Sequence, residues 1–236
     1  MDSVKVGIAG LGTVGSGTVN VLKRNARDIA RRVGRPIEIT HIGARRDNPA
    51  CDTQGIRLSR DIFAVATDPD IDILVELIGG IDTARELVLT AIKNGKHIVT
   101  ANKALIAEHG NEIFLAAQEH GVDVAFEAAV AGGIPILKAL GEGLAANHIN
   151  WVAGIINGTG NYILTEMEQG ARGFDEVLAE AQALGYAEAD PTFDVEGVDA
   201  AHKLTILASI AFGIPLQFSK VYMEGISRIT IEDVNS

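Results

Sequence analysis

The N-terminal stretch places a glycine-rich turn between a predicted strand and a predicted helix, and this order restricts the fold more than any other feature. Residues 4–9 are mostly apolar and stop at a glycine, which predicts a short buried strand. An apolar helical pattern begins within the turn and continues to Leu22. The turn itself reads Gly10-Leu11-Gly12-Thr13-Val14-Gly15.

Each glycine of this GxGxxG turn has a physical purpose. Gly10 allows a tight turn, Gly12 lets the backbone approach a pyrophosphate, and Gly15 lets the helix pack closely on the strand. The helix N-terminus then offers N–H groups and a partial positive charge to phosphates. Between a strand and a helix, the turn predicts dinucleotide binding. A glycine-rich turn of some other α/β protein is the alternative.

The same strand and helix rhythm continues along the chain. Apolar runs predict strands at Ile37–Ile42, Ile71–Leu77, Lys96–Val99 and Val122–Phe126, with helices at about Thr83–Asn94 and Glu108–His120. This alternation predicts an α/β fold with a Rossmann-type, doubly wound parallel sheet. Ligands of such sheets bind at the carboxyl ends of the strands, where Thr100 and Lys103 are expected.

The end of the second predicted strand bears on the choice of cofactor. An acid usually binds the ribose 2′-OH of NAD there, but this chain has Arg45 and Arg46. A guanidinium suits the 2′-phosphate of NADP, so the sequence favours NADP. Asp47 follows directly and leaves NAD open, and a solvated basic turn is the alternative.

A loop of small residues, Glu127–Pro135, predicts a domain boundary. We expect residues 1–134 to form the NAD(P)-binding domain and residues 135–236 to form an α+β domain for substrate binding, catalysis and dimerisation. In the second domain the pattern predicts a strand at Ile149–Ile156, which could present an apolar interface, between helices near 136–145 and 162–169. A further helix is predicted at about 174–184.

The stretch from Gly185 to Leu204 combines five acids with a lysine. Glu188, Asp190, Asp194, Glu196 and Asp199 precede Lys203. Glycine and proline predict a loop as far as Glu196, whereas Asp199 and Lys203 share one face of a predicted helix. A solvated i,i+4 ion pair is the alternative. Because a nicotinamide needs a substrate site and no other stretch pairs acids with a lysine, we interpret this one as the substrate site.

Composition excludes several other classes of protein. The net charge is −11 and the pI is about 5.0, which argues against nucleic-acid binding. One cysteine, Cys51, excludes an internal disulfide and a cysteine-based zinc site. A basic-then-apolar leader and a long apolar run are both missing from the sequence, so we expect a cytoplasmic protein without a membrane span.

Several separate stretches together resemble one family. They are the glycine turn, Thr100–Lys103, Glu127–Pro135, Asn157–Leu164, Gly185–Pro191 and Asp194–Leu204. Over nearly its whole length the chain resembles homoserine dehydrogenase. The resemblance implies NAD(P)H-dependent, reversible reduction of L-aspartate 4-semialdehyde to L-homoserine, on the route to threonine and methionine. It also implies a homodimer formed through the second domain.

The resemblance further implies roles for single residues. Lys203 matches the proton donor and acceptor at the substrate oxygen, and Asp199 matches a neighbour that binds and orients the substrate. Glu188 and Asp194 match substrate-binding acids, and Lys103 matches a lysine near nicotinamide and substrate. Gly185 joins the expected cofactor-binding residues. A monovalent cation, usually sodium, is implied at Glu127, Val130, Gly132 and Ile134, bound largely by main-chain carbonyls.

The chain departs from the family pattern in two places. Gly160 stands where the family usually has a second threonine after Asn157. The family pattern also continues beyond Ser236, so we expect a partial or C-terminally truncated chain. Two other functions stay open as alternatives. The chain could be a truncated, inactive dinucleotide-binding module, or a related amino-acid dehydrogenase, such as one acting on aspartate.

Overall fold

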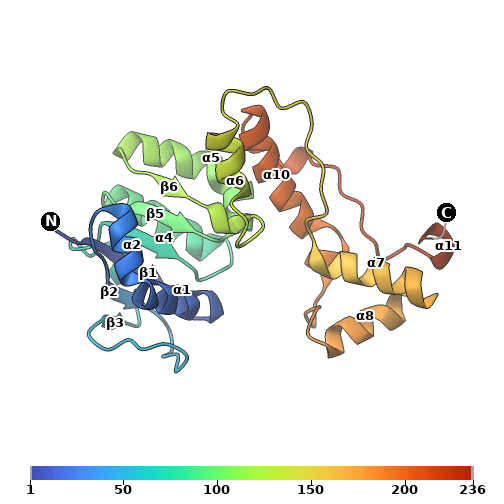
Figure 1. The fold of residues 1–236 in the computed structure, drawn as a ribbon, viewed down its shortest axis with the longest axis horizontal. Coiled ribbons are helices and arrows are strands. Elements are labelled where there is room, and N and C mark those ends of the chain that lie inside the picture. Colours follow the sequence, from blue (N-terminus) through green and yellow to red (C-terminus); the bar gives the residue numbers. More distant parts are fainter. Residues whose placement is uncertain (1, 235–236) are drawn as a thin grey trace. The chain divides into compact units, whose positions relative to one another are not determined.

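The computed structural model describes residues 2–234, which divide into two compact units after Pro135. Unit 1 is a parallel sheet with helices on both faces, and unit 2 is built from helices joined by long loops (Figure 1). None of the helices within residues 2–234 combines the length and the apolar character needed to cross a membrane.

The sheet of unit 1 has six parallel strands in the order β3-β2-β1-β4-β5-β6. The strands are β1 Val4–Ala9, β2 Ile37–Gly43, β3 Arg57–Ser59, β4 Ile73–Glu76, β5 His97–Thr100 and β6 Val124–Ala125. The strand order reverses between β1 and β4, and dinucleotides bind at the carboxyl ends of strands beside such a reversal. The predicted doubly wound parallel sheet is therefore confirmed.

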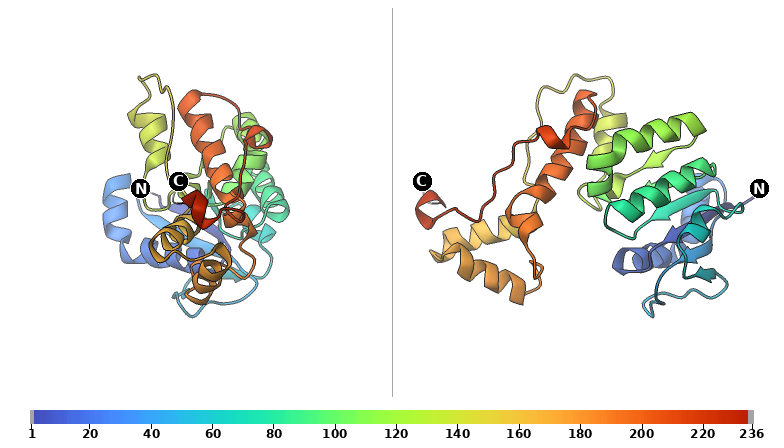
Figure 2. Two further views of the ribbon diagram at one scale, coloured as in Figure 1. Left: turned by 90° about the vertical axis from the view of Figure 1, so that its right-hand side faces the viewer. Right: turned by 180° about the vertical axis from the view of Figure 1, so that it is seen from behind.

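Helices cover both faces of this sheet. They are α1 Thr13–Arg24, α2 Ala26–Val33, α3 Phe63–Ala66, α4 Asp82–Lys93 and α5 Lys103–His120, followed by a 3₁₀ turn at Glu127–Ala129. Helices α1 and α2 lie on the face turned to the viewer in Figure 1, and α4 and α5 lie on the face seen from behind in Figure 2.

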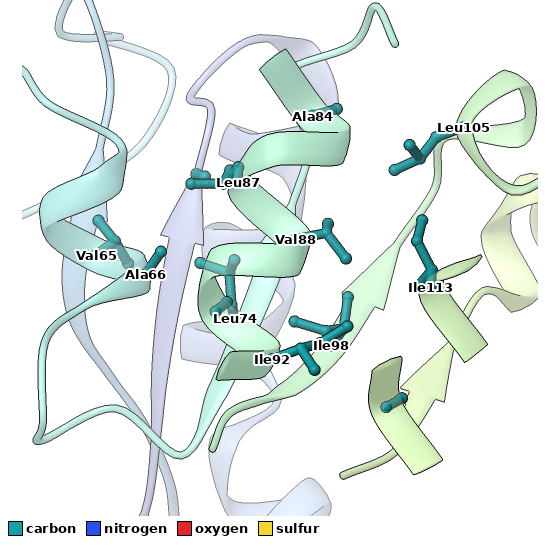
Figure 3. Close-up of a cluster of buried hydrophobic side chains, with 13 residues drawn as sticks. Val65, Ala66, Leu74, Ala84, Leu87, Val88, Ile92, Ile98, Leu105 and Ile113 are labelled. Atoms are coloured by element: carbon teal, nitrogen blue, oxygen red, sulfur yellow. The ribbon is translucent and has the colours of Figure 1, made fainter. Parts of the chain in front are cut away.

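Two apolar clusters, one on each face of the sheet, form the core of unit 1. Leu74 packs with Leu87 and Ile98 under α4 (Figure 3), whereas its chain neighbour Val75 packs with Ile8 on the α1 face. Successive side chains of a strand point to opposite faces, so a strand covered on both sides buries apolar side chains at successive positions, as Leu74 and Val75 of β4 do. This explains why the strands appear in the sequence as short apolar runs.

Unit 2 consists of short and medium helices. They are α6 Ile136–Lys138 with a π-helical turn Ala139–Gly143, α7 Gly158–Gly170, α8 Phe174–Ala183, α9 Thr192–Val195, α10 Val198–Phe212, a 3₁₀ turn Phe218–Lys220 and α11 Ile231–Val234. Helices α7 and α8 lie side by side (Figure 1) around the buried Ile163, Met167 and Val177. Arg172, in the turn between them, contacts Glu166 at 2.6 Å and also Glu180.

The predicted strand at Ile149–Ile156 is wrong. This segment has no secondary structure, and Trp151 and Ile155 are 75% and 82% exposed. A strand needs a neighbour for its N–H and C=O groups, and the described part of unit 2 contains no other strand. Asp194, expected in a loop, lies on the short helix α9, whose start is fixed by Asp190 accepting from the N–H of Thr192.

Candidate active site

The glycine turn of unit 1 has the geometry that its sequence predicts. Gly10 has a φ of +101°, and a side chain there would overlap the carbonyl of Leu77. A side chain at Gly15 would overlap the carbonyl of Gly10, so α1 approaches the end of β1 closely. Gly12 faces open space within 4 Å, and the N-terminus of α1 carries no side-chain cap. The turn can therefore accept an anionic ligand at the helix N-terminus.

In the loop after β2 the two arginines and the acid that follows them have different surroundings. Arg45 and Arg46 are exposed, while Asp47 accepts a hydrogen bond from Arg60 at 2.9 Å. Arg60 also donates to the carbonyl of Ala44 at 3.2 Å, which fixes its guanidinium against this loop. Asp47, the acid that directly follows the two arginines, is thus paired with a cation at the surface.

Asn48 connects this loop to the glycine turn, a role that the sequence did not indicate. Its amide donates to the carbonyl of Leu11 at 2.8 Å and accepts from the N–H of Ala50 at 2.9 Å. An asparagine side chain that bonds the backbone two residues on is a recognisable turn former, but its second contact joins segments far apart in sequence.

The ends of β4 and β5 hold the next group of predicted residues. Thr100 is buried, and its hydroxyl donates to the carboxylate of Glu76 at 2.6 Å. Asn102 caps α5 by accepting from the N–H of Leu105 at 3.1 Å, so α5 begins at Lys103 and not at Glu108. Lys103 is half-buried in the first turn of this helix, just beyond the carboxyl end of β5.

The predicted cation loop follows β6. Val130 is buried, whereas Gly132 and Ile134 are exposed. The turn closes through a bond from the N–H of Ile134 to the carbonyl of Ala131 at 2.9 Å, and Glu127 begins the preceding 3₁₀ turn. Within residues 2–234 no three His, Cys, Asp or Glu side chains are grouped to hold a metal. A site of main-chain carbonyls is of a different kind and stays a prediction.

In unit 2 the structure brings Lys203 and Asp199 together on the first turns of α10. The Lys203 ammonium donates to Asp199 Oδ2 and to the carbonyl of Ile156, both at 2.7 Å. Their side chains are only 19% and 9% exposed. The pair is therefore largely withdrawn from solvent and is fixed by main chain from outside its own helix.

Asn157 joins this pair to a third predicted residue. Its amide nitrogen donates to Asp194 Oδ1 at 2.7 Å and to Asp199 Oδ2 at 2.9 Å. Its amide oxygen accepts from the N–H of Gly160 at 2.6 Å and so caps α7. One amide therefore uses both donors and its acceptor to hold two acids beside the lysine.

The remaining predicted residues of unit 2 lie in the loop after α8. Glu188 is exposed, and its carbonyl accepts from Gln182 at 3.0 Å. Gly185 ends α8 with a φ of +78°. Asp190 bonds the hydroxyl of Thr192 at 2.6 Å, and this contact lowers the pKa of its carboxyl. Asp190 therefore shapes the loop, while Glu188 presents its carboxylate to solvent.

Two models of protein families match the chain, one for each unit. The model described as the NAD-binding domain of homoserine dehydrogenase matches residues 10–127. The model described as homoserine dehydrogenase matches residues 135–236.

Curated proteins and solved structures give the same picture. A homoserine dehydrogenase of Pseudomonas aeruginosa is 72% identical over 100% of the chain and 54% of its own length. The crystal structure of a homoserine dehydrogenase from Thiobacillus denitrificans is 61% identical, with a TM-score of 0.95 over 99% of this chain and 55% of that one. A hyperthermophilic archaeal homoserine dehydrogenase in complex with NADPH is 26% identical, with a TM-score of 0.82 over 97% and 75%. The chain spans about half the length of the curated relatives it matches.

Proposed function

Because the chain belongs to the homoserine dehydrogenase family, we propose that its protein interconverts L-homoserine and L-aspartate 4-semialdehyde with a nicotinamide cofactor. The observation that carries this proposal is the buried Lys203–Asp199 pair, held by Asn157 beside Asp194. Unit 1 binds the cofactor and unit 2 binds the amino-acid substrate.

The reduction transfers a hydride to the aldehyde carbon, and negative charge develops on the aldehyde oxygen. Lys203 donates a proton to this oxygen and takes it back in the reverse direction. Asp199 and the carbonyl of Ile156 hold the ammonium in place through bonds of 2.7 Å each. The lysine therefore reaches the substrate in a fixed geometry, which lowers the entropy cost of the proton transfer.

The substrate also carries an ammonium group, which an acid can bind. We assign this role to Glu188, whose carboxylate is exposed, together with Asp194. Asp194 already accepts a bond from Asn157, so its carboxylate orientation is set before substrate arrives.

The proposed cofactor is NADP, with NAD as the alternative. Arg45 and Arg46 are exposed after β2 and suit a 2′-phosphate, while Asp47 is engaged by Arg60. The NADPH bound by the archaeal relative supports the same choice. Thr100, Lys103 and Gly185 stay predictions for further cofactor contacts, as does a sodium-like cation at Glu127–Ile134.

We also propose a homodimer that forms through unit 2. The segment 149–156 has no regular secondary structure, and it leaves Trp151 and Ile155 largely exposed. Large apolar side chains exposed together are typical of interaction surfaces. A cytoplasmic location stays a prediction of the sequence.

The test is NADPH consumption by the purified protein with L-aspartate 4-semialdehyde, with NADH assayed in parallel. We expect turnover that favours NADPH, and Lys203→Ala is expected to lose at least about 100-fold in kcat because its proton donor is missing. NADPH affinity should be retained in this variant. Lys220→Ala, an exposed lysine of the same unit, is the control.

Three outcomes would contradict the proposal. Normal turnover in Lys203→Ala removes this residue from the chemistry. Binding of NADPH without turnover of either homoserine or the semialdehyde supports the inactive dinucleotide-binding module instead, and turnover of aspartate alone supports the related dehydrogenase.

A further inference from the structure

Glu76 is a fully buried acid at the cofactor edge of the sheet, and the proposed mechanism does not use it. It is the last residue of β4 and has 0% exposure. One carboxylate oxygen accepts from the N–H of Ile78 at 2.9 Å, and the other accepts from the hydroxyl of Thr100 at 2.6 Å. The side chain therefore connects its own loop to the end of the neighbouring strand β5.

These bonds belong to a closed ring that joins the loops after β4 and β5. The oxygen of Thr100 also accepts from the N–H of Asn102 at 3.0 Å. Asn102 in turn donates from its amide to the carbonyl of Gly80 at 2.6 Å, which returns the ring to the loop after β4. Gly80 has a φ of +73°, a left-handed conformation that glycine adopts without strain.

The loop held by Glu76 also borders the glycine turn. The N–H of Leu77 donates to the carbonyl of Ala9 at 2.8 Å. A side chain at Gly10 would overlap the carbonyl of Leu77 and lie 3.1 Å from the nitrogen of Ile78. The N–H group that Glu76 fixes is thus the one that packs against the first glycine of the dinucleotide turn.

We propose that Glu76 is a positioning residue for the dinucleotide, which sets the glycine turn and the loops after β4 and β5 in one fixed arrangement. Because it is fully buried, it acts through these loops and does not touch the cofactor. The inference rests on the proposed function, since it takes unit 1 to be the cofactor-binding unit.

The chemistry of the ring requires a carboxylate. Both oxygens of Glu76 face donors, and an ionised carboxylate has only acceptors. In Glu76→Gln the amide oxygen can still accept from Ile78, but the new NH₂ group meets the Thr100 oxygen. An NH₂ group cannot accept, so the Thr100 hydroxyl proton would lose its acceptor in a buried place, while the Thr100 oxygen would accept from both Asn102 and the new amide. The substitution keeps the shape of the side chain and removes the acceptor of one buried donor in the ring.

The experiment measures the dissociation constants of NADPH, by fluorescence titration, and of NADP⁺, by calorimetry, for the purified protein and its variants. We expect Glu76→Gln to raise both constants by about tenfold, since one buried contact is lost. Thr100→Val should give a similar loss, and the double variant should lose no more than the stronger single one, because both changes break the same ring. Thr100→Ser keeps the hydroxyl and should recover most of the affinity.

Three results would overturn the proposal. Unchanged constants in Glu76→Gln show that the ring does not affect binding. A loss confined to NADP⁺ shows that Glu76 acts by its charge on the oxidised nicotinamide and not by position. Additive losses in the double variant show that the two residues act separately. The exposed Glu86→Gln is the matched control, and if Glu76→Gln does not fold, Glu76→Asp decides, because it keeps a carboxylate that is too short to bond both donors. Failure of the unchanged protein to bind NADPH would instead refute the proposed function.

Discussion

The amide of Asn157 holds two acids beside each other. Asn157→Asp replaces this amide with a carboxylate, which has the same shape but is a third acid. The Asn157 nitrogen lies 2.7 Å from Asp194 Oδ1 and 2.9 Å from Asp199 Oδ2. A carboxylate can keep the contact of the amide oxygen with the N–H of Gly160, at 2.6 Å, so the cap of α7 survives. The substitution therefore turns the two hydrogen bonds to the acids into two repulsive contacts, and it leaves the rest of the side chain intact.

The size of the effect follows from Coulomb's law. Two unit charges about 4 Å apart repel by about 4 kcal/mol at an effective dielectric constant of about 20. Two such repulsions replace two attractive bonds, and side-chain movement, solvent and proton uptake relieve most of them. We expect a net loss of about 3 kcal/mol in the free energy of unfolding at pH 8.

The penalty should depend on pH with a definite sign. Neighbouring carboxylates raise the folded-state pKa of the introduced carboxyl, so the folded state binds more protons than the unfolded state does. The penalty is therefore largest above that pKa and shrinks as the pH falls from 8 towards 5. Asn157→Ala loses the same bridge without adding a charge, so its penalty should change much less.

Urea unfolding followed by far-UV circular dichroism at pH 5 to 8 measures both variants, with NADPH turnover as a second readout. Asn147→Asp is the control, since this exposed asparagine donates to a nearby carbonyl, that of Leu144. If the penalty of Asn157→Asp is below about 1 kcal/mol at pH 8, or does not change with pH, the bridge does not hold these acids as argued.

Three further predictions concern other parts of the chain. Gly15→Ala should weaken NADPH binding at least tenfold by fluorescence titration, because α1 must move from the strand end, whereas Gly17→Ala, which faces open space within 4 Å, should not. Burial lowers the pKa of Lys96, so the unfolded state binds more protons at alkaline pH than the folded state does. Urea unfolding should therefore show the protein gaining stability from pH 8 to 10 relative to Lys96→Met. A difference in stability between the two proteins that stays constant over this range would contradict this. Replacing Trp151 and Ile155 together by serine should lower the mass measured by light scattering from that of a dimer, and an unchanged mass would exclude this segment from the interface.

The sheet of unit 1 could be predicted because its information is local. Strands covered on both faces favour apolar side chains at successive positions, and β4 carries them at Ile73–Val75, whereas β1 and β2 are apolar at alternate positions over their first half. Strand β3, Arg57–Ser59, was not predicted, because three residues with two polar side chains leave no pattern. Its place in the sheet comes from pairing with His41–Gly43, which periodicity cannot show.

The segment 149–156 shows the opposite error. Its apolar residues permit a strand, but a strand exists only where another backbone pairs with it. The described part of unit 2 has no such partner, so the segment has no regular secondary structure, and Trp151 and Ile155 lie at the surface. Periodicity thus predicts which face a strand would bury, and not whether it finds a neighbour.

The two positioning residues, Asn157 and Glu76, escaped prediction for a related reason. Asn157 bonds acids 37 and 42 positions away, and Glu76 bonds Thr100, 24 positions away. Asn157 directly precedes a helix, and Glu76 directly precedes a loop. At such positions a polar side chain is ordinarily a local cap or a surface group. The sequence indicated only that each residue comes directly after an apolar run, and ligands are expected at the ends of such runs.

The same distinction argues against one of the two interpretations of Asp199 and Lys203, that of a solvated ion pair. A solvated i,i+4 pair on one helix contributes a few tenths of a kcal/mol and leaves both side chains free to move. Here the pair is largely buried, Lys203 is held by a carbonyl 47 positions away, and Asp199 by an amide 42 positions away. Contacts from a separate segment fix the lysine in one orientation, which an isolated surface pair does not require. A group that transfers a proton must be held in this way, because a small displacement of the donor costs orders of magnitude in rate.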